Sequence, residues 1–211
     1  MKANAQSTEL KALMLPTSDQ PALRFAIVTV LLAAVYIVAH GATAFVVEPI
    51  QSRLFEDVTV FASLLYLPHG VRVISTWIWR WQAIPGLILG ALIAELLFTD
   101  ASIVAMLEPV LLESILVGAL SAYIAFEALR LAGEDIYAGR NLRLQWTHLL
   151  VIGIVSSLVN SIGQSIVFGG FVMPDDAFLV VLFYAIGDIF GLLAVMLLAV
   201  LAFRRLERSR T

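Results

Sequence analysis

A small set of polar, charged and helix-perturbing residues lies inside the long apolar segments of this 211-residue chain, and these residues are the candidates for binding. They are Pro68, His69, Gly70, Arg72, Glu113, Asn160, Gln164 and Asp188. A charge near the centre of a bilayer costs about 2.5 kcal/mol or more on an isolated helix, so it usually faces the bundle interior and pairs. We therefore expect Arg72 to form an ion pair with an acidic residue, for which Asp188 and Glu113 are the candidates.

The segment that contains Arg72 also predicts a broken helix. Pro68 removes a backbone donor, and Gly70 permits unusual backbone angles. Non-helical backbone inside a membrane is tolerated only where protein or a water-filled cavity satisfies it, and in transporters such breaks mark binding sites. We therefore expect a polar pocket at mid-depth, with a simple kink and a structural ion pair as the alternative.

A second group of polar residues forms a stripe along one helix. Asn160 and Gln164 are four residues apart and share a helix face with Ser156. Hydrogen bonding between neighbouring helices is the simplest role for such a stripe, and orientation of a ligand is the alternative.

Pairs of glycines four residues apart predict close helix packing. They are Gly86 with Gly90, and Gly187 with Gly191. Small residues at this spacing let two helices approach closely. We expect the contacts to lie within the chain, and dimerisation is the alternative.

Motifs of known catalytic and cofactor sites are missing from the sequence. There is no HExxH, GxSxG or P-loop pattern, and no cysteine, which excludes disulfides and thiolate chemistry. His40 and His69 lie at different depths, which argues against a shared haem. We expect no enzymatic activity, no cofactor, no metal and no nucleic-acid partner.

The elements that position these residues must be membrane-spanning helices. The chain is 61% hydrophobic and 14% charged, whereas soluble domains are about 45–50% apolar and about 25% charged. A span needs about 20 apolar residues. We expect an all-α bundle between polar tails at 1–23 and 204–211, with tight links at Arg80–Gln82 and 99–101. The predicted spans are 24–47, 58–79, 83–99, 102–129, 147–171 and 177–203.

The basic residues predict how this bundle is oriented. With six spans, one side carries the arginines and lysines of both tails, of the 80–82 link and of the 130–146 loop. Because Lys and Arg are enriched in cytoplasmic loops, both termini are predicted to be cytoplasmic. Trp77, Trp79, Trp81 and Trp146 fall at the same predicted interface.

Three motifs together resemble the MASE1 type of bacterial membrane sensor domain. The first is Leu67–Gly70, similar to a proline–glycine element of the family that is followed by an apolar helix. The second is Pro85–Gly86, followed by Gly90 and Ala94. The third is Gly187, Asp188 and Gly191, similar to a G-D-x-x-G element in the closing helix.

The resemblance covers roughly residues 58–203 and implies a sensory module of the bacterial inner membrane. It does not extend to the longer helix array and the fused output domain that are usual in the family. We therefore expect a sensory or accessory module that acts through a separate membrane-protein partner and binds a small-molecule ligand. A substrate-binding subunit of a vitamin-type importer and a structural subunit of a larger membrane complex are the alternatives.

Overall fold

The computed structural model describes residues 20–54, 63–99, 108–139, 146–168 and 177–208, and within these ranges all regular structure is helical. Five helical segments of the described ranges are long and apolar enough to cross a membrane, which makes this a multi-pass helical membrane protein. They are Pro21–Leu54, Leu67–Phe98, Pro109–Leu131, Thr147–Val167 and Leu182–Ala202. The second segment covers most of two predicted spans, residues 67–79 of 58–79 and residues 83–98 of 83–99.

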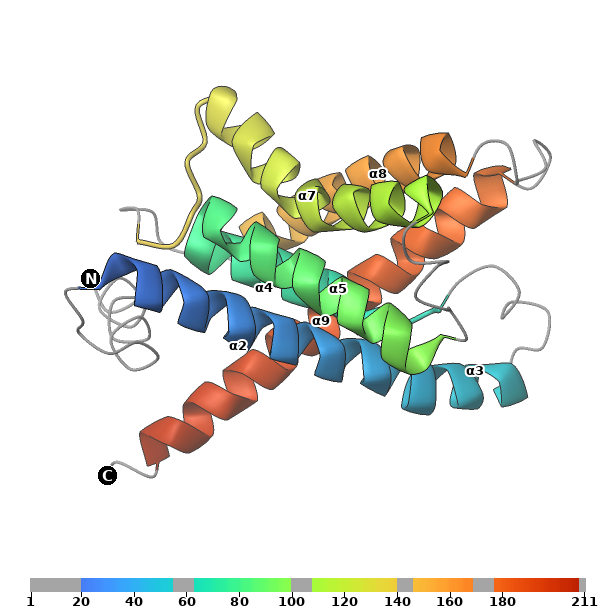
Figure 1. Ribbon diagram of the computed structural model, residues 1–211, viewed down its shortest axis with the longest axis horizontal. Helices are drawn as coiled ribbons and strands as arrows, with labels where there is room; N and C mark the ends of the chain where they lie inside the picture. The colour runs from blue at the N-terminus through green and yellow to red at the C-terminus, as the bar shows by residue number, and fades with distance from the viewer. Residues whose placement is uncertain (1–19, 55–62, 100–107, 140–145, 169–176, 209–211) are drawn as a thin grey trace.

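Each segment is built from shorter elements (Figure 1). The first contains α2 (Pro21–Ala42), a π-helical turn η1 (Thr43–Val47) and α3 (Glu48–Leu54). The second contains α4 (Leu67–Trp79), a 3-10 turn η2 (Arg80–Ala83) and α5 (Ile84–Phe98). The remaining helices are α7 (Pro109–Leu131), α8 (Trp146–Val167) and α9 (Ala177–Arg208).

Proline marks the beginning of many of these helices. Pro21, Pro68, Pro85 and Pro109 each lie in the first turn of α2, α4, α5 and α7. The first turn has no intrahelical acceptor for its N–H groups, so proline loses nothing there and its ring presets the helical φ. The structure thus places Pro68 at a helix start, whereas the sequence predicted a break inside a span. The beginning of that predicted span, 58–62, lies outside the described residues.

The chain reverses direction between α4 and α5. Helix α4 runs antiparallel to α2, because the N–H of Leu67 donates to Thr43 Oγ1 (3.3 Å) near the end of α2, while later residues of α4 contact earlier ones of α2. Helix α5 runs parallel to α2, because Gly86 lies against Leu32 and Gly90 against Tyr36. The reversal falls in η2, at the predicted 80–82 link (Figure 1).

A short segment after α7 closes over this reversal. Arg80 ends α4 with φ 57° and ψ −135°, and its guanidinium lies 4.2 Å from the ring centroid of Tyr137. Trp77 Nε1 donates to the carbonyl of Ile136 (3.1 Å). Burial raises the pKa of Tyr137, so its hydroxyl remains a neutral donor to Glu127 Oε1 (2.9 Å).

The last helices pack in alternating directions. Antiparallel pairing of α7 with α8 is shown by the contacts of Ser121 with Ser156 and of Ser114 with Gln164. Helix α8 is likewise antiparallel to α9. Helix α9 runs parallel to α4, and an added Cβ at Gly191 would overlap the carbonyl of Tyr66. The glycine pairs therefore lie at helix contacts within the chain.

Candidate functional site

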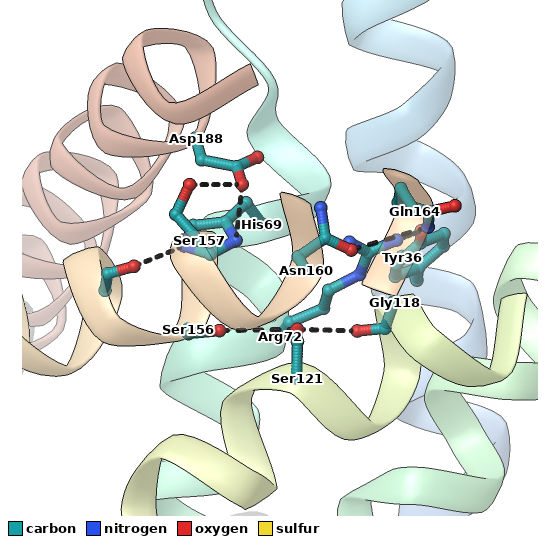
Figure 2. A network of polar contacts seen from close by, with 11 residues as sticks. Tyr36, His69, Arg72, Gly118, Ser121, Ser156, Ser157, Asn160, Gln164 and Asp188 are labelled. Carbon is teal, nitrogen blue, oxygen red and sulfur yellow. Dashed lines mark hydrogen bonds and ion pairs between the residues drawn. The ribbon is translucent and has the colours of Figure 1, made fainter. Parts of the chain in front are cut away.

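A buried histidine and a buried aspartate from two different helices lie side by side in the bundle. His69 of α4 is 0% exposed and Asp188 of α9 is 1% exposed. His69 Nδ1 lies 3.4 Å from Asp188 Oδ2, and His69 Nε2 lies 3.2 Å from the carbonyl of Gly153 on α8 (Figure 2). Ser157, one turn further along α8, donates to Asp188 Oδ2 at 2.9 Å.

The position of the histidine follows from the start of α4. Helix α4 begins at Leu67, and the N–H of Tyr66 donates to the carbonyl of Gly187 on α9 (2.9 Å). A Cβ on Gly70 would lie only 2.7 Å from Val195 Cβ, so a glycine is required for this approach of α4 to α9. The close approach brings His69 to the level of Asp188.

Arg72 lies in the same bundle interior, but its guanidinium points away from Asp188. It is 6% exposed, and its Nη2 donates to the hydroxyl of Tyr36 at 2.8 Å. The guanidinium carbon lies 5.6 Å from the ring centroids of both Tyr36 and Tyr66, a distance at which an aromatic face attracts a cation. Figure 2 shows it directed toward Tyr36 and Gly118.

No carboxylate of the described residues forms an ion pair with Arg72. This differs from the predicted pairing with Asp188 or Glu113. Asp188 is instead the neighbour of His69. The structure does not bring Glu113 to the centre: its side chain is exposed on α7. The physical reason is helical phase, because α7 turns its Ser114, Gly118 and Ser121 positions inward and Glu113 lies about 100° from Ser114.

The predicted polar stripe of α8 lies against α7. Gln164 Nε2 donates to the carbonyl of Ser114 at 3.0 Å and lies 3.5 Å from Asn160 Oδ1. Ser156 Oγ donates to Ser121 Oγ at 3.3 Å. These contacts join two helices, and Asn160 is buried at 4% exposure.

Several groups of the centre were not singled out from the sequence. They are Tyr36, Tyr66, Gly118 and Gly153. The tyrosines carried a signal, because each places a hydroxyl inside an apolar segment. Nothing in the sequence pointed to the two glycines, since Gly153 acts through its carbonyl oxygen and Gly118 through its missing Cβ.

The centre can hold charge and protons. Three of its side chains are charged or change charge near neutral pH, namely a guanidinium, an imidazole and a carboxylate, and all three are buried. Among the residues that the structure describes, no group of three or more His, Asp or Glu side chains has metal-binding geometry.

Fold and centre together define a multi-pass helical membrane protein with ionisable side chains buried between its helices. The chain matches no model of a known protein family, no curated protein and no solved structure.

Proposed function

We propose that this protein is a sensory or accessory module of the bacterial cytoplasmic membrane that binds a small anionic ligand at its polar centre and acts through a separate protein partner. The observation that carries the proposal is the buried guanidinium of Arg72, which has no ion pair with a described carboxylate. Charged groups at membrane depth usually pair and mark functional sites. An anionic ligand would supply the missing counter-charge.

The resemblance to MASE1 domains is consistent with this role. Two of the three motifs that carry it come from α4 and α9, and these two helices contact each other at Gly70 and Gly191; the third lies on α5. The same contact positions His69 beside Asp188. Two of the elements that are similar to the family thus contribute to the candidate site.

Six crossings with both termini in the cytoplasm form part of the proposal. The reversal at Arg80 supports the count, because α4 and α5 pass α2 in opposite directions. The basic residues support the orientation. Phe25, near the start of α2, lies 5.9 Å from the ring of Trp81, so Arg24 and Arg80 are at one end of the bundle. Helix α9 runs toward that end and carries Arg204 and Arg205 there.

The ligand part of the proposal is tested by comparing Arg72→Gln with Arg72→Lys. We expect mass spectrometry of protein purified gently from its host membrane to detect a small anion with the wild type. Arg72→Lys keeps the charge and should retain part of the ligand. Arg72→Gln should lose it, because breaking a buried charge pair costs about 3–5 kcal/mol, or at least a hundredfold in affinity.

The same protein preparations provide the controls and the results that would contradict the proposal. Circular dichroism and size-exclusion chromatography must show that both variants are folded. Equal amounts of the anion in the wild type and in Arg72→Gln, or no anion in any preparation, would contradict ligand binding at Arg72. Purification of the wild type without a stoichiometric membrane-protein partner would contradict action through a partner.

A further inference from the structure

We infer that the polar centre binds a monocarboxylate together with one proton, and that the pair of His69 and Asp188 takes up this proton. The inference rests on the proposed function and names the class of its ligand. It starts from the hydrogen-bond partners of His69, which constrain where protons lie in the ligand-free centre.

The two nitrogens of His69 face different kinds of acceptor. A backbone carbonyl only accepts hydrogen bonds, so the nitrogen that faces Gly153, Nε2, carries a proton. Nδ1 faces the carboxylate of Asp188 at 3.4 Å. A bare Nδ1 lone pair beside a carboxylate oxygen forms no hydrogen bond. One additional proton placed between Nδ1 and the carboxylate makes a hydrogen bond, whether the proton resides on the imidazole or on the carboxylate. His69 and Asp188 can therefore bind one exchangeable proton between them.

Charge balance links this proton to the anion. Without the proton, the positive charge of Arg72 and the negative charge of Asp188 cancel, and a bound anion would leave a net negative charge among buried groups. With the proton, the centre carries one net positive charge, and a single anionic charge neutralises it. Because an unbalanced charge is expensive in an interior of low dielectric constant, anion and proton bind better together than apart.

The same balance selects the class of anion. A dianion such as hydrogen phosphate would leave one negative charge uncompensated even with the proton bound. Arg72 Nε is buried and has no hydrogen-bond partner in the described part of the chain, so it is a donor available to an oxygen of the ligand. A planar guanidinium matches the two oxygens of a carboxylate. The rings of Tyr36 and Tyr66, both beside the guanidinium, favour a ligand with an apolar body.

Other ionisable groups around the pair come from three of the helices packed against it. Arg72 and Tyr66 belong to the chain in and just before α4, Tyr184 belongs to α9 and Tyr36 to α2. Helix α8 contributes the hydroxyl of Ser157 and a carbonyl oxygen, and α7 contributes the close contact of Gly118 with Arg72. Between about pH 5 and pH 8 tyrosine and arginine do not ordinarily change charge, whereas histidine does.

The experiment measures proton uptake on binding. Full-length protein in lipid nanodiscs is titrated calorimetrically with acetate, butyrate and octanoate, and with chloride as the monoanion that lacks a carboxylate. Each titration is repeated in two buffers of different ionisation enthalpy, between about pH 5 and pH 8. We expect uptake of about one proton per carboxylate, and an affinity that falls about tenfold per pH unit once the free pair has lost its proton. We expect octanoate to bind more tightly than acetate.

Two variants separate the partners of the pair. Asp188→Asn removes the negative charge, so it should bind octanoate without proton uptake and at all pH values as tightly as the wild type does at low pH. His69→Gln retains the negative charge and loses the base, so it should bind weakly and with little dependence on pH. Ser165→Ala removes a hydroxyl of α8 that, among the described residues, bonds only to the carbonyl of Ser161, and it should still take up the proton. If a variant does not fold, the buffer comparison on the wild type still decides the matter.

Failure of this inference differs from failure of the proposed function. Carboxylate binding that is lost in Arg72→Gln but takes up no proton overturns the coupling and leaves the binding function. Chloride binding as tight as octanoate binding overturns the assignment of a carboxylate, as does the absence of any carboxylate binding to the wild type. Binding that is unchanged in Arg72→Gln overturns both the inference and the proposed site.

Discussion

At the scale of single residues, the centre is organised by what each charged side chain has for a neighbour. Asp188 Oδ2 accepts a hydrogen bond from Ser157 and lies 3.4 Å from His69 Nδ1, whereas Asp188 Oδ1 has no hydrogen-bond partner among the described residues. Arg72 receives one hydroxyl and two aromatic faces. Aromatic faces attract a cation but carry no net charge, so they lower the cost of burying Arg72 without balancing it. Because Arg72 is the positively charged group and its Nε has no hydrogen-bond partner among the described residues, Arg72 is the expected point of attachment for an anion.

Gly118 is the residue at which the packing around Arg72 can be tested. A Cβ added there would lie 2.6 Å from Arg72 Nη2 and 2.8 Å from Cζ, so Gly118→Ala should force the guanidinium or helix α7 to move. We expect a loss of roughly 1–3 kcal/mol in the free energy of unfolding, measured in mixed micelles with sodium dodecyl sulfate. The loss should be smaller when the substitution is made in Arg72→Ala, because the group it meets is then gone. An equal loss in both backgrounds would show that the glycine does not contact Arg72.

At the scale of elements, the reversal between α4 and α5 depends on an unusual backbone conformation. Arg80 has φ 57° and ψ −135°, a region that glycine adopts freely and that costs other residues about 1–3 kcal/mol. The surrounding contacts hold it there, since Trp77 and Arg80 both contact the segment that contains Ile136 and Tyr137. The close approach of α4 to α9 also depends on glycine, because a Cβ at Gly70 or at Gly191 would overlap atoms of the other segment.

The strain at Arg80 is tested by comparing Arg80→Gly with Arg80→Ala. Both variants lose the contact with the ring of Tyr137, and only glycine also relieves the backbone. We expect Arg80→Gly to be more stable than Arg80→Ala by about 1–3 kcal/mol, measured by the same unfolding titration. Equal stability of the two variants would show that the backbone at the reversal is not strained.

At the scale of the whole molecule, the helices alternate in direction. Helix α2 is antiparallel to α4 and parallel to α5, α7 is antiparallel to α8, and α9 is parallel to α4. The first described residues and the last ones consequently lie at the same end of the bundle (Figure 1). The even number of crossings that we propose is consistent with this alternation.

The number of crossings can be measured with single cysteines, because the chain has no native cysteine. Ser52, Gln82, Thr99 and Glu134 are exposed positions at the ends of helical segments. With six crossings, cysteines at 52 and 99 should react with an impermeant maleimide added outside intact spheroplasts, and cysteines at 82 and 134 should not. If Leu67–Phe98 crossed only once, positions 52 and 99 would lie on opposite sides, and their reactivity would differ. Permeabilised spheroplasts provide the control, since all four positions should then react.

The sequence alone determined the class of this protein and much of its segmentation. A chain with 61% hydrophobic residues has too little polar surface for water, and its apolar runs must form helices because every backbone group in a bilayer needs an internal partner. The link near residues 80–82 was also predicted from the sequence. These features depend on composition and on local chemistry, so they can be read without knowing what each helix packs against.

Only the tertiary structure decided which of the polar residues meet. Whether Asp188 faces His69 or Arg72 depends on the rotation of α9 about its axis, and a single residue step turns a side chain by about 100°. The rotation of α7 about its own axis leaves Glu113 on the exposed surface, although the sequence predicted a depth similar to that of the other central residues. The position of a residue in the sequence predicts its depth in the membrane. Which partner it meets depends on the rotation of its helix, and the close contacts of Gly70, Gly118 and Gly191 fix that rotation.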